Sequence, residues 1–262
     1  MRLSVVLITK NEASNLEACL ASVRFADEVI VLDYGSTDGT PALAERLGAK
    51  VHVSNDWPGF GPQKNRVLAL AQGDWVLSVD ADERVTPALQ AEIEAAVQPT
   101  PGQSQLSVFQ FPRLSSYCGQ QIHHSGWYPD WVTRLFRKGS ARFSDDLVHE
   151  RLLPDGPVGQ LKSPLLHDSF KSLESVVDKM NRYSTASAEA LYARGRRATL
   201  ATALGHGVWS FVRSYLLRTG FRDGQMGLAL AISNAEGSYY RYLKLWLLAR
   251  DADRKAHQGR QP

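Results

Sequence analysis

Short apolar runs alternate with helical patterns over the first hundred residues. Runs rich in β-branched residues predict strands at residues 3–8, 28–33, 50–54 and 74–80. A helical pattern follows each run, and the last one begins with Thr86-Pro87, an N-cap followed by an N1 proline. Nearly continuous apolar strands that alternate with helices favour an α/β fold with a mainly parallel sheet covered on both faces. Ligands of such sheets bind beyond the carboxyl ends of the strands.

The rest of the chain changes character twice. Residues 106–170 are rich in aromatic residues, Gly, Pro and His, and short apolar runs there predict a further sheet with loops. Helical composition begins at residue 172, and two amphipathic stripes follow. We therefore predict a catalytic domain over residues 1–170, a C-terminal helical extension over 171–250 and a disordered tail over 251–262. The stripes comprise Val208, Phe211, Val212, Tyr215 and Leu216, and then Tyr239, Tyr242, Leu243, Trp246 and Leu247.

Composition narrows the class and the compartment. With 44% hydrophobic and 22% charged residues among 262, the chain can bury one sizeable core. Cys19 and Cys118 lack CxxC spacing, which favours a reducing compartment. The start of the chain lacks a secretory pattern and no run of eighteen apolar residues occurs, so we expect a cytoplasmic protein with at most peripheral membrane contact.

Charge is distributed unevenly along the chain. Residues 182–262 carry 13 Lys and Arg against 5 Asp and Glu, so the basic charge is concentrated at the C-terminal end. An anionic membrane surface, an anionic substrate or nucleic acid would each fit this pattern. No recognised nucleic-acid module accompanies it, and we expect no nucleic-acid partner.

Acidic residues lie at the ends of two predicted strands. Asp80 and Asp82 follow the fourth strand, and if the extended conformation persists their carboxylates face the same side and form a site for Mg²⁺ or Mn²⁺. Asp33 ends the second strand, where it could accept hydrogen bonds from a nucleobase or ribose. From these residues alone, an ordinary turn rich in Gly, Ser and Asp is the favoured explanation for Asp33, and Asn11 and Glu12 after the first strand share that ambiguity.

Motifs from residue 3 to about residue 250 together resemble the family 2 glycosyltransferases. They are ITKNE, VLDYGSTDGT, DWPGFGPQKNRVLALAQGDWVLSVDADE, GWYPDWVTRLFR, FSDDLVHE and SNAEGSYYRYLKLWLL. More narrowly, the chain is similar to the lipopolysaccharide inner-core β-glucosyltransferases of the WaaE/KdtX type. The resemblance implies a GT-A fold, meaning a Rossmann-like sheet that binds nucleotide-diphospho-sugars, and here with a C-terminal helical extension.

The resemblance also implies which residues bind the donor. It implies a UDP-sugar, a divalent cation and an inverting displacement at the anomeric carbon. Tyr34 departs from the small residue that relatives carry after the motif Asp, which alters the expected shape of the nucleoside pocket. A solvated basic helix face is the alternative explanation for Arg66. The implied nucleoside residues are Thr9, Asn11, Glu12 and Asp33, and Asp80 is implied to meet the nucleotide and Asp82 the metal. The residues implied near the donor are Gln63, Lys64 and Arg66, and Lys64 could offset negative charge on the diphosphate.

An inverting transfer needs a base for the proton of the acceptor hydroxyl. The VHE sequence occupies the position of the catalytic acid in GT-A enzymes, so we predict Glu150 as the base, with Asp145 and Asp146 as alternatives. His149 either orients a neighbouring group or is simply hydrogen-bonded in place. The resemblance implies His167 as a further metal ligand, whereas without it His167 would be structural.

Aromatic residues crowd the segment before the predicted base. Trp127 and Tyr128 could stack on sugar rings, with Asp130 and Arg134 as further acceptor contacts, whereas Trp131 fits core packing almost as well. The C-terminal helices combine cations and aromatic rings in the manner of an interfacial helix pair, although packing against the catalytic domain would use the same stripes. The cations are Arg213, Arg218, Arg222, Arg241, Lys244 and Arg250.

Three hypotheses for the function follow. The first is glucose transfer from UDP-glucose to an inner-core heptose of a lipid-linked saccharide, the lipid A-core, by an enzyme peripherally bound to the inner membrane. The second keeps the transferase class and changes the acceptor to a polyprenyl-linked sugar, a capsule sugar or a protein. The third is a non-catalytic protein that binds a nucleotide-sugar or a membrane.

Overall fold

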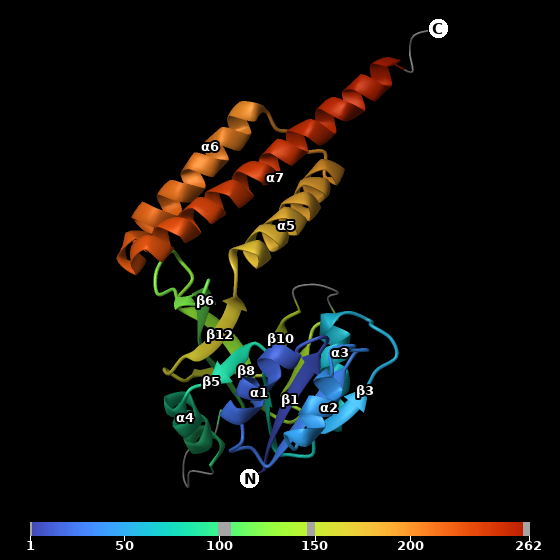
Figure 1. Cartoon of the computed structure of the whole chain (residues 1–262). Helices are drawn as coiled ribbons and strands as arrows, with labels where there is room; N and C mark the ends of the chain where they lie inside the picture. The colour runs from blue at the N-terminus through green and yellow to red at the C-terminus, as the bar shows by residue number, and fades with distance from the viewer. Residues whose placement is uncertain (1, 99–105, 146–149, 259–262) are drawn as a thin grey trace. The chain divides into compact units, whose positions relative to one another are not determined.

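The computed structural model describes residues 2–98, 106–145 and 150–258. The chain divides into two compact units. The first comprises residues 1–114 and 129–167, and the second comprises residues 115–128 and 168–262. The expected boundary near residue 170 is therefore close, but the segment 115–128 belongs with the C-terminal helices (Figure 1).

Four strands and three helices alternate at the start of the first unit, as the apolar runs predict. Thr86 accepts a hydrogen bond from the Leu89 backbone N–H at 3.1 Å, which confirms the helix start expected there. The elements are β1 (Leu3–Thr9), α1 (Ala13–Ser22), β2 (Glu28–Asp33), α2 (Thr40–Arg46), β3 (Lys50–Val53), α3 (Phe60–Leu70), β4 (Trp75–Ser78), β5 (Glu83–Val85), α4 (Pro87–Val97), β6 (Val108–Tyr117), β8 (Asp130–Arg137), β9 (Ala141–Phe143), β10 (Leu152–Pro154), β11 (Val158–Gln160) and β12 (Leu165–Phe170).

The main sheet is parallel on one side and antiparallel beyond it. In the described part of the chain its strand order is β3-β2-β1-β4-β8-β6-β12-β5. The pairs of β1 with β2, β1 with β4 and β2 with β3 are parallel, whereas β4 with β8 and β6 with β8 are antiparallel. The parallel side confirms the α/β architecture. Its carboxyl edge carries the segments that follow β1, β2 and β4.

Alternation along β1 divides the core between the two faces of the sheet. Leu3, Val5 and Leu7 pack with residues of α1 and α4 on one face. Val6 packs with Val67 of α3 on the other face. Helices therefore cover both faces, and a sheet buried on both sides requires the continuous apolar runs that the sequence shows.

The second unit is mostly helical. Helices α5 and α6 each pack along the long helix α7 (Figure 1). A Cβ built on Gly207 of α6 would come within 3.2 Å of the Tyr239 Cβ, so glycine permits the close approach of α6 and α7. The described helix α7 continues through Gln258, which corrects the expected disordered tail from residue 251. The elements are β7 (Gln120–Gln121), α5 (Leu173–Ala193), α6 (Leu200–Phe211), a π-helix η1 (Val212–Leu217), a 3₁₀ helix η2 (Gly220–Asp223) and α7 (Gly224–Gln258).

The surface of this unit is more apolar than the helical pattern suggests. Leu200, Leu204 and Val208 recur every fourth residue on α6, and Val208 is 65% exposed. Leu216 and Leu217 in η1 are exposed as well. The first predicted stripe is thus not buried as a whole, because Val208 and Leu216 face solvent. None of the described helices has the length and apolarity needed to cross a bilayer.

Candidate active site

A cavity of about 460 Å³ lies in the first unit. Its wall combines Lys64 from α3, Asp80 after β4 and Glu150 before β10. The β8 segment adds Trp131 and Arg134, and Trp131 is 42% exposed, so it does not fill the core. This volume lies within the usual range of ligand pockets, about 300 to 1,000 Å³.

Lys64 joins two carboxylates at this cavity. Its Nζ lies 3.0 Å from Asp80 Oδ1 and 2.8 Å from Glu150 Oε1. The lysine side chain is only 6% exposed. Because the Lys64 side chain is buried, solvent screens its two ion pairs only slightly, and Lys64 holds the two carboxylates at a defined separation.

Two arginines extend the network from Asp80. Arg134 Nη2 donates to Asp80 Oδ2 at 2.5 Å and to the buried Glu83 Oε1 at 2.9 Å. Arg113 donates to the same Glu83 oxygen at 3.2 Å and to Asp130 Oδ2 at 2.7 Å. Burial alone raises the pKa of Asp80, but Arg134 and Lys64 together lower this pKa well below its usual range. Asp80 is therefore an anion at neutral pH.

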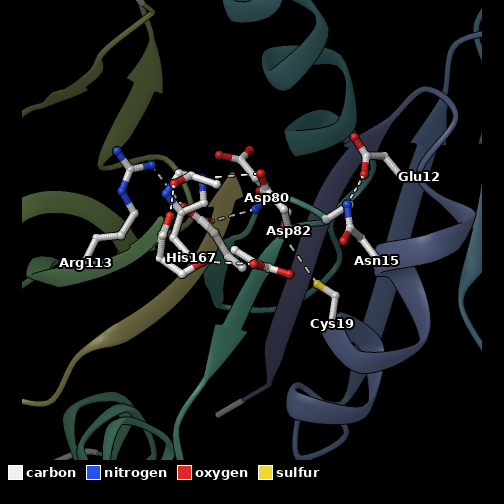
Figure 2. Close-up of polar contacts among 12 residues, drawn as sticks. Glu12, Asn15, Cys19, Asp80, Asp82, Arg113 and His167 are labelled. Atoms are coloured by element: carbon white, nitrogen blue, oxygen red, sulfur yellow. Dashed lines mark hydrogen bonds and ion pairs between the residues drawn. The ribbon is translucent and has the colours of Figure 1, made fainter. Parts of the chain in front are cut away.

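The Asp80-Ala81-Asp82 segment turns instead of staying extended. The Glu83 N–H donates to the Asp80 carbonyl at 2.9 Å, which closes the turn and separates the two carboxylates. The expectation that both carboxylates face one side as in a strand is therefore wrong. Asp80 joins the cation network, whereas Asp82 Oδ2 lies 3.3 Å from His167 Nε2 (Figure 2). Antiparallel pairing of β12 with β5 sets His167 opposite Glu83 and so beside Asp82.

Asp82 and His167 fit a divalent cation that shares its coordination with a substrate. A carboxylate oxygen and an imidazole nitrogen are both suitable ligands for Mn²⁺, and Mg²⁺ commonly binds through one or two carboxylates plus phosphates and water. Within residues 2–98, 106–145 and 150–258, no group of three or more His, Cys, Asp or Glu side chains is placed to hold a metal. Asp82 and His167 could thus supply two ligands, and the others would have to come from a bound substrate or water.

Cys19 contacts the same turn through its thiol group. Its Sγ donates to the Asp80 carbonyl at 3.5 Å (Figure 2). Burial raises the pKa of the Cys19 thiol to about 12, so it remains protonated and unreactive.

The predicted nucleoside residues lie at the ends of β1 and β2. Thr9 Oγ1 donates to Asp33 Oδ2 at 2.9 Å, and the Ser36 N–H donates to Asp33 Oδ1 at 2.9 Å. Asn11 Oδ1 accepts from the Thr37 N–H at 2.9 Å. The structure thus brings Thr9, Asn11 and Asp33 together in a hydrogen-bonded double loop.

Glu12 and Tyr34 complete this loop. Glu12 accepts from Asn15 Nδ2 at 2.7 Å, and its N–H donates to Thr40 Oγ1 at 2.9 Å (Figure 2). The Tyr34 ring lies 5.3 Å from the Trp57 ring, and Lys10 Nζ lies 4.0 Å from the Tyr34 centroid. The unusual Tyr34 therefore forms an aromatic wall at this end of the sheet.

Gln63 and Arg66 have different environments on α3. Gln63 is buried and its Nε2 has no hydrogen-bond partner within the described residues, which leaves a donor for a ligand. Arg66 instead forms two hydrogen bonds with Asp56, at 2.7 Å and 2.9 Å, on the exposed surface. This position corresponds to the solvated helix face that the sequence analysis leaves open.

Among the remaining candidates, Arg134 lines the cavity and the other described ones do not. Asp145 is 81% exposed, lies 3.8 Å from Arg142 and is absent from the cavity wall, so the structure does not support it as the base. Asp146 and His149 lie outside the described residues. Trp127 and Tyr128 belong to the second unit, where Trp127 packs on Tyr117 and Phe170. Asp130 and Arg134 are engaged by their ion pairs.

Sequence reasoning missed Arg113 and Glu83. Glu83 completes the DADE run, and a charged residue at position 113 interrupts an apolar strand. An unmatched charge in such a strand is the available signal, because a buried charge requires a partner. The partner itself depends on strand pairing, which the sequence does not reveal.

Comparison with known proteins agrees with this architecture. The family model described as "Glycosyl transferase family 2" matches residues 4–152. An uncharacterized glycosyltransferase of Rickettsia conorii is 32% identical over 254 residues, covering 93% of this chain and 89% of that protein. The lipopolysaccharide core biosynthesis glycosyltransferase LpsC of Rhizobium meliloti is 30% identical over 257 residues, covering 92% of this chain and 89% of that protein.

A solved structure supports the expected fold. Residues 1–349 of TarS from S. aureus, crystallised with UDP, align with a TM-score of 0.50 at 16% identity, covering 96% of this chain and 92% of that one. This likeness confirms the GT-A fold.

Proposed function

This chain belongs to glycosyl transferase family 2, and we propose that it transfers glucose with inversion from UDP-glucose to a heptose of the lipopolysaccharide inner core. The observation that carries the proposal is the placement of Glu150 beside Asp80 through Lys64, in one cavity at the carboxyl edge of the sheet. The relation to LpsC over nearly the whole chain favours a core saccharide as the acceptor.

Glu150 is the proposed base. The acceptor oxygen attacks the anomeric carbon on the face opposite the diphosphate, and Glu150 takes the proton of that hydroxyl as the new bond forms. The bond from the anomeric carbon to the diphosphate oxygen breaks, and its electron pair leaves with UDP. Lys64 positions the Glu150 carboxylate, since its Nζ lies 2.8 Å from Oε1. This displacement converts an α-linked donor into a β-linked product.

Asp82 and His167 are the proposed protein ligands for Mg²⁺ or Mn²⁺. When bound, the cation would offset the negative charge that develops on the leaving diphosphate. Thr9, Asn11, Glu12 and Asp33 line the proposed nucleoside site. The unpartnered Gln63 Nε2 supplies a further donor near the diphosphate.

The second unit is the proposed membrane-docking element at the cytoplasmic face of the inner membrane. Its exposed Leu200, Leu204 and Val208 form one apolar face on α6, and exposed Leu216 and Leu217 follow in η1. Exposed arginines accompany them at residues 196 and 197. Apolar residues flanked by cations suit an anionic lipid surface.

A donor and acceptor panel tests this function. The purified chain is offered UDP-glucose, UDP-galactose and UDP-N-acetylglucosamine with Mn²⁺ or Mg²⁺ and a defined truncated core acceptor, and the product linkage is read by NMR. We expect β-linked glucose on heptose. If the chain transferred glucose to a polyprenyl-linked or capsule sugar instead, the proposed acceptor would be wrong. If it neither transferred nor hydrolysed any of the UDP-sugars, the proposed enzyme activity would be refuted.

A further inference from the structure

The second unit contains a cavity of its own, with a volume of about 560 Å³. Its wall is formed by α5, α6, η1, α7 and the segment 115–128, and every lining residue belongs to this unit. Four cations line it, namely Lys179, Arg213, Arg218 and Arg241. No Asp or Glu is among the lining residues of the described chain.

These cations lack the carboxylate partners that Lys64, Arg113 and Arg134 have at the cavity of the first unit. None of the four forms an ion pair with a described residue. Lys179 Nζ lies 4.7 Å from the Phe170 ring centroid, which is an aromatic contact and leaves the charge uncompensated. Like charges collected in a cleft repel one another and attract anions, so this arrangement favours an anionic ligand.

Other cations of the same region have different contacts and do not line the cavity. Lys244 donates to Asn181 Oδ1 at 2.7 Å and to Ser184 Oγ at 2.8 Å, so it ties α7 to α5. The Arg250 guanidinium lies 5.0 Å from the Trp246 ring centroid. Arg222 is exposed and does not line the cavity. The six cations of the C-terminal region thus differ in role, and only three of them line this cavity.

The cavity wall has further features of a built site. Ser125 is buried with a backbone φ of 59°, and its Oγ has no hydrogen-bond partner within the described residues. A buried hydroxyl without a partner is unusual and indicates a missing ligand or water. The backbone of Gly126 lies against the Arg218 guanidinium so closely that a Cβ there would overlap it, so glycine at this position leaves room for Arg218 beside the cavity.

Arg213 and Ser214 project from the π-helix η1. Such irregular turns occur frequently at functional sites.

The wall also offers surfaces that suit a sugar. Tyr183, which is 54% exposed, supplies an aromatic ring and Ser238 supplies a hydroxyl, whereas the Ser210 and Ser233 hydroxyls already bond the Asn234 carbonyl and the Tyr117 hydroxyl. Guanidinium groups bind phosphate oxygens through paired hydrogen bonds. We propose that this cavity binds a phosphate ester carried on a saccharide. The inference goes beyond the proposed function because it assigns a second binding site, separate from the donor residues.

Direct binding tests the inference without depending on turnover. The full chain, with UDP and Mn²⁺ at saturating concentration to fill the donor site, is titrated by calorimetry with glucosamine 1-phosphate. We expect saturable one-to-one binding of glucosamine 1-phosphate. Glucosamine, which lacks the phosphate, should bind at least tenfold more weakly. Arg213→Gln together with Arg241→Gln should weaken binding at least tenfold, whereas the matched control Arg222→Gln should bind as the wild type does.

Further arms separate the phosphate sources and guard against misfolding. Arg213→Lys keeps the charge but not the paired hydrogen bonds, so its affinity should lie between those of the wild type and the double variant. Circular dichroism confirms that each variant is folded. Inorganic phosphate should bind more weakly than the sugar phosphate. Equal affinity of the double variant and the Arg222 control would overturn the inference. Binding to phosphatidylglycerol vesicles without binding to the sugar phosphate would overturn it as well, because the cavity would then serve a lipid surface.

Discussion

The two cavities of this chain arrange their charges in opposite ways. In the first unit, Lys64, Arg134 and Arg113 alternate with Glu150, Asp80, Glu83 and Asp130 in one continuous network. In the second unit, four cations face a cavity that no carboxylate lines within the described chain. Compensated charges hold the proposed catalytic groups in place, whereas uncompensated charges remain able to attract an anionic ligand. The same residue types therefore serve geometry in one unit and binding in the other.

Removing one arginine from each cavity should show this difference most strongly. Arg134→Met leaves Asp80 and the buried Glu83 short of a partner, so we expect a loss of about 3 to 5 kcal/mol in the free energy of unfolding. Arg213→Met removes an exposed cation from a repulsive group, and we expect a change within about 0.5 kcal/mol. Urea denaturation measures both. Equal losses would show that the two cavities do not differ in charge compensation.

The metal ligands should be the next most sensitive group. Asp82→Ala removes a carboxylate from the pair with His167, so transfer should fall at least about a hundredfold, equivalent to about 2.7 kcal/mol. Calorimetry should show weaker Mn²⁺ binding in the presence of UDP, and EDTA should abolish wild-type transfer until Mn²⁺ is restored. Asp155→Asn alters an exposed carboxylate of the same unit and should change neither quantity. Full Mn²⁺ affinity in Asp82→Ala would exclude this site.

Glu28 tests charge compensation at a buried carboxylate outside the cavity. It accepts from Ser4 Oγ at 2.5 Å, the Gln72 N–H at 2.6 Å and Lys50 Nζ at 2.8 Å. Burial opposes ionisation, but Lys50 and these donors lower the pKa of Glu28 to about 2. Glu28→Gln should therefore cost about 2 kcal/mol of stability at pH 7.

The pH dependence of that loss has a definite sign. Because the folded pKa of Glu28 is about 2 and the unfolded value is about 4.3, the unfolded chain binds more protons between these values. The stabilisation is complete above the unfolded pKa and disappears as pH falls through the folded pKa. The difference between wild type and Glu28→Gln in urea denaturation should shrink, not grow, as the pH falls from roughly 5 to roughly 2.

Arg66 should show the smallest effect. Its pair with Asp56 is exposed, and exposed ion pairs contribute little. We expect Arg66→Ala to leave both the free energy of unfolding and the KM for UDP-glucose unchanged within error. A large rise in KM would show that Arg66 leaves Asp56 to contact the donor, as the sequence motif alone suggests.

Local patterns predict the parallel half of the fold but not its continuation. The four apolar runs and the Thr86 N-cap lie in contiguous sequence, so periodicity and capping suffice for them. The position of β8 between β4 and β6 depends on pairing of distant segments. The unit boundary within β6 has the same origin, because the strand continues past residue 114 into a segment that packs with the helices.

The site divides in the same way. Motifs identify Lys64, Asp80, Asp82 and Glu150 as candidates, and the structure places Lys64, Asp80 and Glu150 in one network. The motifs do not reveal the turn at Asp80 or the pairing of Asp82 with His167. This pairing depends on the register between β5 and β12. The sequence does not identify Arg113 and Glu83, because a buried ion pair is recognised only when both partners have been placed in space. The sequence does not predict the cationic cavity either, because the residues that line it come from several helices.

The role of Glu150 is the central claim, and the rate of transfer by Glu150→Gln measures it most directly. The variant keeps the size of the side chain and removes its ability to accept the proton, so product formation from UDP-glucose should fall about 10² to 10⁴-fold while Mn²⁺ and UDP binding persist. Asp145→Asn, at the exposed carboxylate nearby in sequence, should retain the wild-type rate. Transfer by Glu150→Gln at the wild-type rate would contradict the proposed mechanism.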